Sequence, residues 1–472
     1  MERLQLLSKS DLEQIHSTSL TILQDIGVQI PNREALAALS DSGAQVDLEK
    51  QIVRIPAGLM EGALRSVGKQ FILHGRDRSR TARFGYGDFN FPATAAQVTL
   101  IDGEDWSRRE ATLNDFRDAV KVCDALEHVN IAGGMGLPRE IAPEVRDIYM
   151  AAEMIKMTPK PSQVFASNVT TLRIIIEIYE TVAGGASEHR QYPMMAGFIE
   201  PISPLRFDRN GSEILVECAK KGIPIVLAPM VQSSATGPAT LAGTLAQENA
   251  EILAGIALTQ AVQPGLAIGY GGSCHTMDLR TMLCSFGAPE QVLLGIAMAQ
   301  LPLSYGLPVL FNAGLTDSKR VDVQAGLEKG MTLLSGALAG IETFAHMGIC
   351  GADQGASLEQ LIIDDATAAY VKRVLKGIAV TPKTLALDAI RRVGIGGNFL
   401  TDDHTLDHFR DEVAVLEGFD RQNWDSWAAS GSKDMLDWAR EKKRNILKTH
   451  EFDLIDEKLG DEIDRIVARA SG

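Results

Sequence analysis

Short apolar runs alternate with longer amphipathic segments over most of the chain. From residue 89 onward, runs that end in Gly, Ser, Asn or Pro recur roughly every 30 to 45 residues. Several are apolar almost throughout, as at 223–228 and 308–311, which is typical of buried parallel strands. We predict strands at Phe89–Thr94, Val129–Met135, Gln163–Asn168, Met194–Glu200, Pro224–Met230, Leu266–Gly271, Pro308–Asn312 and Thr343–Met347.

Helical periodicity fills the gaps between these runs. It predicts helices at Leu113–Leu126, Val145–Met157, Arg173–Val182, Arg209–Lys220, Leu241–Gln260, Glu290–Leu301 and Val323–Ala337. Eight strand signals with helical crossovers predict an α/β fold, a (β/α)8 TIM barrel at residues 89–380. The rival is an open doubly wound sheet. The first strand is not followed by G-x-G-x-x-G and no P-loop is present, which favours the barrel.

The regions before residue 89 and after residue 380 show different patterns of apolar and polar residues. Residues 1–88 predict a small α+β region: a helix with Ser10 as its cap and Glu13 three residues on, then helix Asn32–Ser42 and strands Ile52–Ile55, Phe71–His74 and Thr81–Phe84. After residue 380 strand signals cease. Residues 381–472 predict a helical extension with helices Thr384–Val393, Leu406–Leu416, Met435–Thr449 and Ile455–Ala470. We expect Trp424, Trp427 and Trp438 to anchor it on the barrel or on a second subunit.

Composition narrows the functional class of this 472-residue chain. A net charge of -15 argues against a nucleic-acid partner, which needs a basic surface. Eighteen consecutive apolar residues occur nowhere, so we expect no membrane span, and the charged N-terminus does not resemble a signal peptide. Five scattered cysteines indicate reduced thiols rather than a disulfide framework. We therefore expect a cytoplasmic protein.

Candidate chemistry lies where the predicted strands end, because the active site of a barrel forms at that face. We predict substrate contacts from Tyr86, Phe91, Gln97, Asn168, Glu200, Gln232, Tyr270, His275, Asn312 and His346. Each could instead organise a loop or pack in the core. Taken together, amides, aromatic rings, histidines and few acids converge on one face, which packing alone does not explain.

Other chemistries find weaker support in the sequence. A zinc site would have to combine the adjacent Cys274 and His275 with Cys350, so we expect no metal. A Schiff-base lysine would have to be Lys319, which lies in a charged run typical of a solvated loop. Gly133-Gly134-Met135-Gly136 could hold a phosphate, but a Gly-rich strand end is weak evidence alone.

Several blocks along the chain carry a family resemblance. They are 12–16, 22–31, 43–47, 53–56, 71–77, 312–319 and 357–365. With these blocks the chain resembles the trimethylamine methyltransferase superfamily over nearly its whole length. The resemblance implies a TIM barrel that moves a methyl group from a methylamine to the Co(I) of a separate corrinoid protein, with no tightly bound cofactor of its own.

The loop after the last predicted strand departs from the family pattern. Members that act on trimethylamine carry pyrrolysine there, and Gly351 stands at that position in our alignment. The chain thus resembles the non-pyrrolysine branch, which acts on quaternary amines, glycine betaine foremost. A quaternary nitrogen leaves as a neutral tertiary amine, so the transfer needs orientation more than acid catalysis. We expect His346 to donate to the substrate carboxylate.

The partners expected from the resemblance are a cognate corrinoid protein, a small quaternary amine and further copies of the chain in a homo-oligomer. Two alternatives stay open. One is a non-catalytic barrel that binds betaine or docks a corrinoid protein, and the other is a Lys-dependent lyase.

Overall fold

A computed structural model describes residues 3–471 of the chain. It has a mixed α/β fold, with a small α+β unit at the N-terminus. That unit contains α1 (Lys9–Thr21), a π-helix (Ile22–Ile26), β1 (Val28–Gln29), α2 (Arg33–Asp41), β2 (Gln45–Asp47), β3 (Ile52–Arg54) and α3 (Ala57–Ser66). The three strands form an antiparallel sheet in the order β1-β3-β2, and α1, α2 and α3 pack on helix α9 (Leu241–Val262).

The first helix begins two residues earlier than the sequence predicts. Ser8, not Ser10, is the cap: the Asp11 N–H donates to Ser8 Oγ at 3.2 Å, and the Ser8 N–H donates to Asp11 Oδ2 at 2.9 Å. Asp11 has taken the place in the capping box that the prediction gave to Glu13.

A parallel sheet forms the centre of the molecule. Its strands are β8 (Gly197–Ile199), β9 (Ile225–Leu227), β11 (Ile268–Gly272), β14 (Val309–Phe311) and β15 (Thr343–Phe344), and they lie side by side in sequence order. Parallel bridges extend the series beyond β15, from Thr343 to Asn90, from Pro92 to Ile131 and from Ala132 to Ser162. Each predicted strand of the 89–380 region thus lies parallel to a neighbour.

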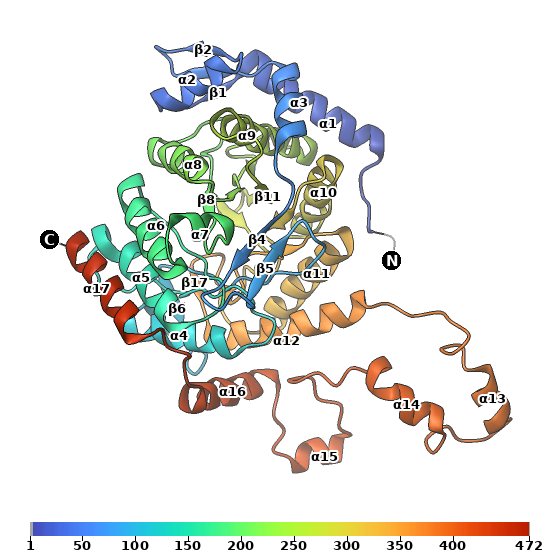
Figure 1. The fold of residues 1–472 in the computed structure, drawn as a ribbon. Coiled ribbons are helices and arrows are strands. Elements are labelled where there is room, and N and C mark those ends of the chain that lie inside the picture. The colour runs from blue at the N-terminus through green and yellow to red at the C-terminus, as the bar shows by residue number, and fades with distance from the viewer. Residues whose placement is uncertain (1–2, 472) are drawn as a thin grey trace.

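Helices connect these strands and surround them. Figure 1 shows them as a ring around the sheet. They are α4 (Leu113–Ala125), α5 (Pro143–Met157), α6 (Val169–Ala183), α8 (Arg209–Lys221), α9, α10 (Pro289–Tyr305), α11 (Val323–Ala339) and α12 (Leu358–Leu375), with α7 (Ala186–Gln191) between α6 and β8. All helices predicted between the strands are present. α12 was not predicted from the sequence, because Glu359, Gln360, Asp364 and Asp365 are buried among apolar residues and obscure the amphipathic pattern.

The sheet has two faces of different character. One face, the inner face, carries Phe198, Val226, Leu310 and Ala345 and packs against a hairpin of β4 (Phe71–His74) and β5 (Thr81–Phe84). The rings of Phe71 and Phe84 stack there at 4.3 Å. A small cavity remains beneath this hairpin, lined by residues of seven of the eight strand segments. The hairpin therefore closes the sheet where its strands begin.

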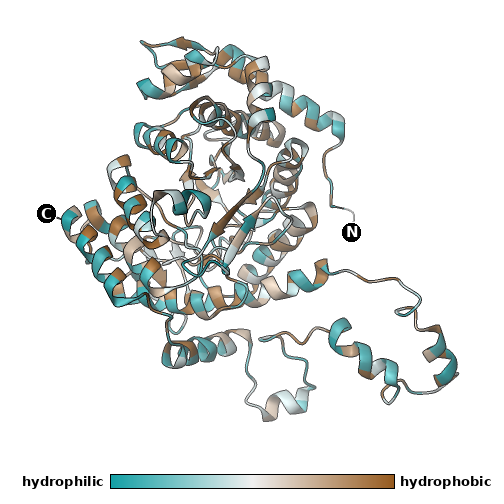
Figure 2. Cartoon of the chain, viewed as in Figure 1, coloured by the Kyte–Doolittle hydropathy of each residue, from teal (hydrophilic) through white to brown (hydrophobic). Residues whose placement is uncertain are grey.

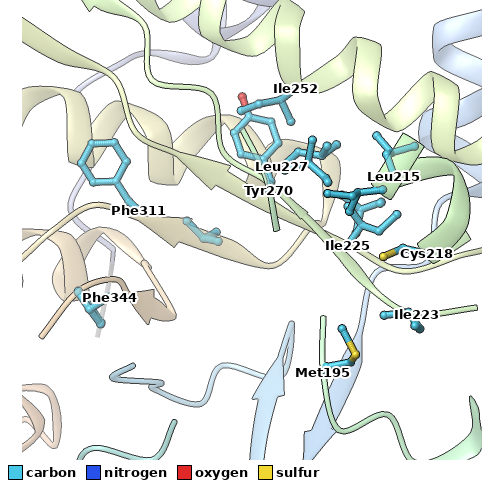
Figure 3. Packing of buried hydrophobic residues seen from close by; sticks show 14 of the residues in the cluster. Met195, Leu215, Cys218, Ile223, Ile225, Leu227, Ile252, Tyr270, Phe311 and Phe344 are labelled. Atoms are coloured by element: carbon cyan, nitrogen blue, oxygen red, sulfur yellow. The ribbon is translucent and has the colours of Figure 1, made fainter. Parts of the chain in front are cut away.

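The outer face packs on the ring of helices. Leu227, Tyr270, Phe311 and Phe344 lie there, and Figure 3 shows Tyr270 and Leu227 pointing toward the helix that carries Ile252. Because strand side chains alternate between the two faces, Gly269 and Gly271 occupy the inner face beside Tyr270. A Cβ at Gly271 would lie 2.8 Å from Ala228 Cβ, so glycine is needed at that close approach.

Short strands form the loops that follow the sheet. One group is β10 (Gln232–Ser233), β12 (His275–Asp278) and β13 (Leu283–Ser285). The other, in the order β16-β17-β6-β7, contains β16 (Ile349–Cys350), β17 (Gly355–Ala356), β6 (Thr99–Ile101) and β7 (Arg108–Glu110). Both groups come from segments that follow the carboxyl ends of the parallel strands, and they carry several of the predicted site residues.

The C-terminal region is helical, as predicted, with α13 (Leu387–Val393), α14 (Asp403–Glu412), α15 (Trp424–Ala429), α16 (Met435–Thr449) and α17 (Glu457–Ser471). α16 packs on α4 and α12, and α17 packs on α5 and α6. His450 Nε2 lies 2.7 Å from Asp124 Oδ2 and ties the end of α16 to α4. Within residues 3–471, no helix is long and apolar enough to cross a membrane.

Candidate functional site

Glu200 and Asn312 are placed by the alternation of their strands. Glu200 follows β8 and lies two residues after Phe198, and Asn312 follows β14 and lies two residues after Leu310. Phe198 and Leu310 are both inner-face residues. Side chains two residues apart share a face, so both polar groups emerge at the carboxyl end of the inner face. The Asn312 amide is buried and donates to Ser273 Oγ, which links the ends of β14 and β11.

The loop after β15 brings His346 and Asp353 to the same place. Gln97, from the segment after the first parallel strand, donates to Asp353 Oδ1 at 3.0 Å. Burial lowers the pKa of His346, and the nearby Asp353 carboxylate partly opposes this shift. Burial raises the pKa of Asp353, while the positive charge of His346 and the Gln97 hydrogen bond act in the other direction. The three side chains therefore form one polar cluster.

The backbone of this loop is strained. His346, Ala352 and Asp353 have φ angles of 69°, 56° and 58°, in the left-handed region that non-glycine residues seldom adopt. Such residues persist only where the surroundings hold them, and they gather at functional sites. Here the buried Asp364 carboxylate accepts from Gly348 N–H at 2.7 Å and from Lys329 Nζ at 2.8 Å, which fixes the loop to α12 and α11.

Glu200, at the end of β8, lies on the same inner face, and the charge of Asp353 acts on it. Water still reaches its side chain, but the surrounding protein raises the pKa of Glu200 to about 7 by desolvation, and the negative charge of Asp353 adds to the shift. A carboxylate whose ionisation is opposed by desolvation and by a second negative charge favours a bound cation, because the positive charge stabilises the anion.

His275 offers an unused hydrogen-bonding ring. Its side chain is fully buried at the start of β12, 4.5 Å from the Phe286 ring, and neither ring nitrogen has a hydrogen-bond partner among the described residues. Burial lowers the pKa of His275 to about 3; the Ser273 backbone opposes this shift, and the positive charge of His346 adds to it. The ring is therefore neutral near pH 7, with one N–H donor and one nitrogen acceptor free.

The buried Glu248 on α9 fixes the loops after β9 and β11. Glu248 accepts from Val231 N–H at 3.0 Å and from Ser273 N–H at 2.7 Å. Gln232 lies next to Val231 and pairs with His275 in the parallel β10–β12 ladder, so the backbones of these two predicted site residues lie side by side. Its backbone also organises a turn, since its N–H donates to Thr236 Oγ1 at 2.9 Å.

Gly351 lies in the strained loop, as its place in the sequence suggested. Its φ is +71°, and a Cβ there would lie 3.2 Å from Ile101 Cδ1. Its N–H donates to the Ser318 carbonyl at 2.6 Å, which joins the loops after β14 and β15. A larger residue at 351 would therefore need both a left-handed backbone and a shift of Ile101.

Two predicted aromatic contacts are wrong because their side chains point away from the site. Tyr270 is fully buried on the outer face and donates through its hydroxyl to Asn249 Oδ1 on α9 at 2.9 Å. Phe91 is also fully buried and stacks on Phe344 at 5.2 Å. The prediction placed both at strand ends without deciding which face they occupied, and the two-residue period directs both outward.

Tyr86 and Asn168 also do not contribute as predicted. Tyr86 precedes its strand and therefore lies at the opposite, amino end, where Arg83 covers its half-exposed ring at 4.4 Å. Asn168 caps α6 by accepting from Thr171 N–H at 3.0 Å, so its side chain serves the helix.

The residues considered for alternative chemistries lie in the following settings. Lys319 is exposed, and its Nζ donates to the Asp317 carbonyl at 2.7 Å, which is not the desolvated setting of a Schiff-base lysine. Gly134 serves packing, since a Cβ there would lie 1.9 Å from the Phe116 ring. No group of three or more metal-ligating side chains occurs in the part of the chain that the structure describes.

Several residues of this face were not predicted from the sequence. Asp353 is one of them, although its charge acts on Glu200 and His346. The aromatic rings near the site are Phe165 and Phe198, which meet edge to face at 5.6 Å, and Phe286 beside His275. Phe198 could have been found, because it precedes Glu200 by two residues and so shares its face.

Comparison with known proteins agrees with the resemblance seen in the sequence. The family model for trimethylamine methyltransferase (MTTB) matches residues 1–471. The trimethylamine methyltransferase MttB of Desulfitobacterium hafniense is 32% identical over 98% of this chain and 92% of its own length. A glycine betaine methyltransferase of the same species is 33% identical over 90% of this chain and 88% of its own. The monomethylamine methyltransferase MtmB of Methanosarcina barkeri, a solved structure, aligns with a TM-score of 0.46 and 12% identity over 97% of this chain and 96% of that chain. The chain is a methyltransferase that belongs to the trimethylamine methyltransferase family.

Proposed function

We propose that this chain transfers a methyl group from glycine betaine to the Co(I) of a separate corrinoid protein. Cobalt attacks the methyl carbon, the carbon–nitrogen bond breaks, and its electron pair stays on nitrogen, so dimethylglycine leaves and methyl-Co(III) forms. The cobalt belongs to the second substrate, and the chain itself needs no tightly bound cofactor. The relative named glycine betaine methyltransferase supports this class of substrate.

The proposal includes a closed (β/α)8 barrel with the reaction at its mouth. The parallel segments follow one another in sequence order without the reversal that a doubly wound sheet would require. Closure joins the segment after Ser162 to β8, and the contact between Phe165 and Phe198 spans that junction. Residues that follow the strands then converge at one opening.

The pairing of Glu200 with Asp353 carries the substrate assignment. The negative charge of Asp353 raises the cost of ionising Glu200, and a trimethylammonium group bound beside Glu200 would relieve that cost. Phe198, two residues before Glu200, would add a cation–π contact of about 0.5–2 kcal/mol. A quaternary nitrogen cannot donate a hydrogen bond, so charge and aromatic faces are the interactions it can use.

The substrate carboxylate is assigned to the two buried histidines, His346 and His275, whose pKa values are lowered by burial. His346 is the main donor, and His275 has a free N–H that a carboxylate oxygen could accept. A hydrogen bond to a charged group contributes roughly 1.5–3 kcal/mol. We expect His346→Ala to raise the KM for glycine betaine about 10- to 100-fold with the fold intact. An unchanged kcat/KM would remove His346 from the site.

Gly351 supports a substrate that arrives already activated. The loop offers no side chain there to form an adduct with a neutral amine. Loss of an amine from trimethylamine itself would expel an amide-like anion, whereas glycine betaine releases a neutral tertiary amine. The barrier then depends mainly on alignment of the methyl group with cobalt, which is worth about 7–11 kcal/mol at best.

Product analysis tests the proposal. The chain, a Co(I) corrinoid protein and glycine betaine should yield dimethylglycine and methyl-Co(III) in equal amounts, by mass spectrometry and absorbance. Binding of glycine betaine without dimethylglycine would mean a non-catalytic binding protein. If only proline betaine or carnitine gave a demethylated amine and methyl-Co(III) in equal amounts, the mechanism would stand and the substrate would be corrected.

A further inference from the structure

A buried ion pair joins α11 and α12 behind the loops of the site. Figure 2 shows hydrophilic and hydrophobic positions mixed along the helices that surround the sheet, and most charged side chains of the chain reach solvent. Lys329 on α11 and Asp364 on α12 do not, since they are 2% and 1% exposed, with Nζ and Oδ2 2.8 Å apart. Within residues 3–471 this is the one ion pair with both side chains buried.

The free energy of folding alone does not account for this pair. Removing two charges from water costs free energy that their mutual attraction barely offsets, and well-packed apolar residues of similar volume are often at least as stabilising. What the pair does provide is a fixed geometry, because each charge also binds a backbone group of a loop that carries site residues.

The two charges hold the loops that follow β14 and β15. Lys329 Nζ donates to the Gly314 carbonyl at 2.6 Å, in the loop after β14. Asp364 Oδ2 accepts from Gly348 N–H at 2.7 Å, in the loop after β15. Gly348 lies two residues after His346, whose φ of 69° persists only because its surroundings hold it. The ion pair therefore ties both loops to the helices close to His346.

The remaining contacts of the pair keep both side chains in place. Gln360 Nε2 donates to Asp364 Oδ1 at 2.8 Å, so this carboxylate accepts from Lys329, from the loop and from its own helix. Lys329 is held as a cation between two acceptors, which is not the state of a Schiff-base lysine. Burial lowers the pKa of His346, the charge of Asp353 opposes this shift, and the charge of Lys329 adds to it.

We propose that Lys329 and Asp364 are positioning residues for methyl transfer, because their ion pair holds the left-handed backbone of His346 and so directs its ring toward the substrate. The role rests on the proposed function, in which His346 donates to the substrate carboxylate. Both side chains act through the loops and neither touches the substrate. A pair that served stability alone would need no contact with these loops, whereas both charges here bind one.

The first test replaces both charges at once in the full-length chain. K329M with D364N keeps the approximate shape of the pair, so circular dichroism should show a folded protein. We expect the KM for glycine betaine to rise about 10-fold and kcat to fall less than about threefold, because a displaced His346 weakens binding more than it alters the reacting bond. K160M is the control: Lys160 is 6% exposed and donates to three carbonyls near the end of α4, so the variant should lose stability with KM unchanged.

The second test observes His346 without turnover, by NMR of the full chain labelled at histidine, with H346Q to assign the signal. The charged groups that act on His346 are Asp353 in its own loop and Lys329 on α11, and His275 on β12 interacts with its charge. K329M removes a charge that lowers the pKa of His346, so this pKa should rise, whereas K160M should leave it unchanged. A wild-type chain that makes no dimethylglycine would refute the proposed substrate, and the pKa of His346 would then decide the role of the pair.

Gln360 provides a milder variant in case the charge variants do not fold. Q360M retains the ion pair and removes one hydrogen bond from Asp364, so the KM for glycine betaine should rise about two- to fivefold in a folded protein. Folded charge variants in which either the KM or the pKa of His346 matches wild type would overturn the proposal. If those variants unfold, an unchanged KM in Q360M would overturn it, and the pair would then serve stability alone.

Discussion

The two ends of the parallel strands differ in almost every physical property. At the amino end, the β4–β5 hairpin covers the inner face with stacked Phe71 and Phe84 in an apolar cluster. At the carboxyl end the same face ends in Glu200, Asn312, His346 and Asp353, with shifted pKa values at three of the four. One end is closed by packing and the other is polar and titratable.

The difference indicates that the amino end of the strands contributes mainly to stability and the carboxyl end mainly to catalysis. Apolar burial stabilises a fold in proportion to the area removed from water, whereas desolvated acids and bases cost stability and offer reactivity. Changes at the amino end should therefore alter the free energy of unfolding, and changes at the carboxyl end should alter kcat/KM. The variants below test whether that separation holds.

The largest expected effect is on stability at the amino end. Phe84→Ala removes a ring that is 4% exposed and stacks on Phe71, and it should lower the free energy of unfolding by about 3–5 kcal/mol. Denaturant titration measures this loss. The kcat/KM of the remaining folded enzyme should change less than about twofold. A large loss of kcat/KM with normal stability would break the comparison.

Glu200→Gln should have the largest effect at the carboxyl end. Loss of one negative charge beside a bound cation should lower kcat/KM for glycine betaine about 10- to 100-fold, which is about 1.4–2.8 kcal/mol. Steady-state kinetics measures it. Glu342→Gln is the matched control, since Glu342 lies at the amino end and accepts from Gly85 and Gly87 N–H groups. That control should alter stability and leave kcat/KM nearly unchanged.

The pH dependence follows from the same acid. Since the pKa of Glu200 is about 7, its negative charge forms as pH rises through that value, and the KM for glycine betaine should fall between about pH 6 and 8. Stability responds in the opposite sense. A carboxyl whose pKa is higher in the folded than in the unfolded state stabilises the fold fully below about pH 4.5, and this contribution is lost as pH rises to about 7. Both trends should disappear in Glu200→Gln.

Tyr270→Phe gives the smallest expected effect and checks the direction in which that side chain points. The variant loses the hydrogen bond to Asn249, so unfolding should become about 0.5–1.5 kcal/mol easier. Because the ring lies on the outer face, KM and kcat should stay constant. A clear rise in KM would place Tyr270 in the site after all.

Sequence patterns predicted the mixed α/β fold and most of its elements. The connecting helices follow from helical spacing, and the strand segments, including the two strands of the hairpin, follow from apolar runs. α12 was missed because Asp364 and Gln360 are buried to hold the site loop, so polar residues interrupt its apolar face. The residues that hold this loop therefore replace apolar residues on the buried face of α12.

The site was predicted only in part, for a geometric reason. Glu200, Asn312 and His346 could be placed from the ends of their strands. Tyr270 and Phe91 were misplaced because a strand end does not say which face a side chain occupies, and a shift of one residue reverses the answer. The link from Gln97 to Asp353 joins residues 256 positions apart and is set by tertiary structure alone.

The most direct test of the account compares two amines in one assay. The chain is mixed with a Co(I) corrinoid protein and either glycine betaine or trimethylamine, and the conversion of Co(I) to methyl-Co(III) is followed by absorbance. The account predicts rapid methylation of cobalt from glycine betaine and none above background from trimethylamine. Methylation from trimethylamine at a rate equal to that from glycine betaine would contradict it.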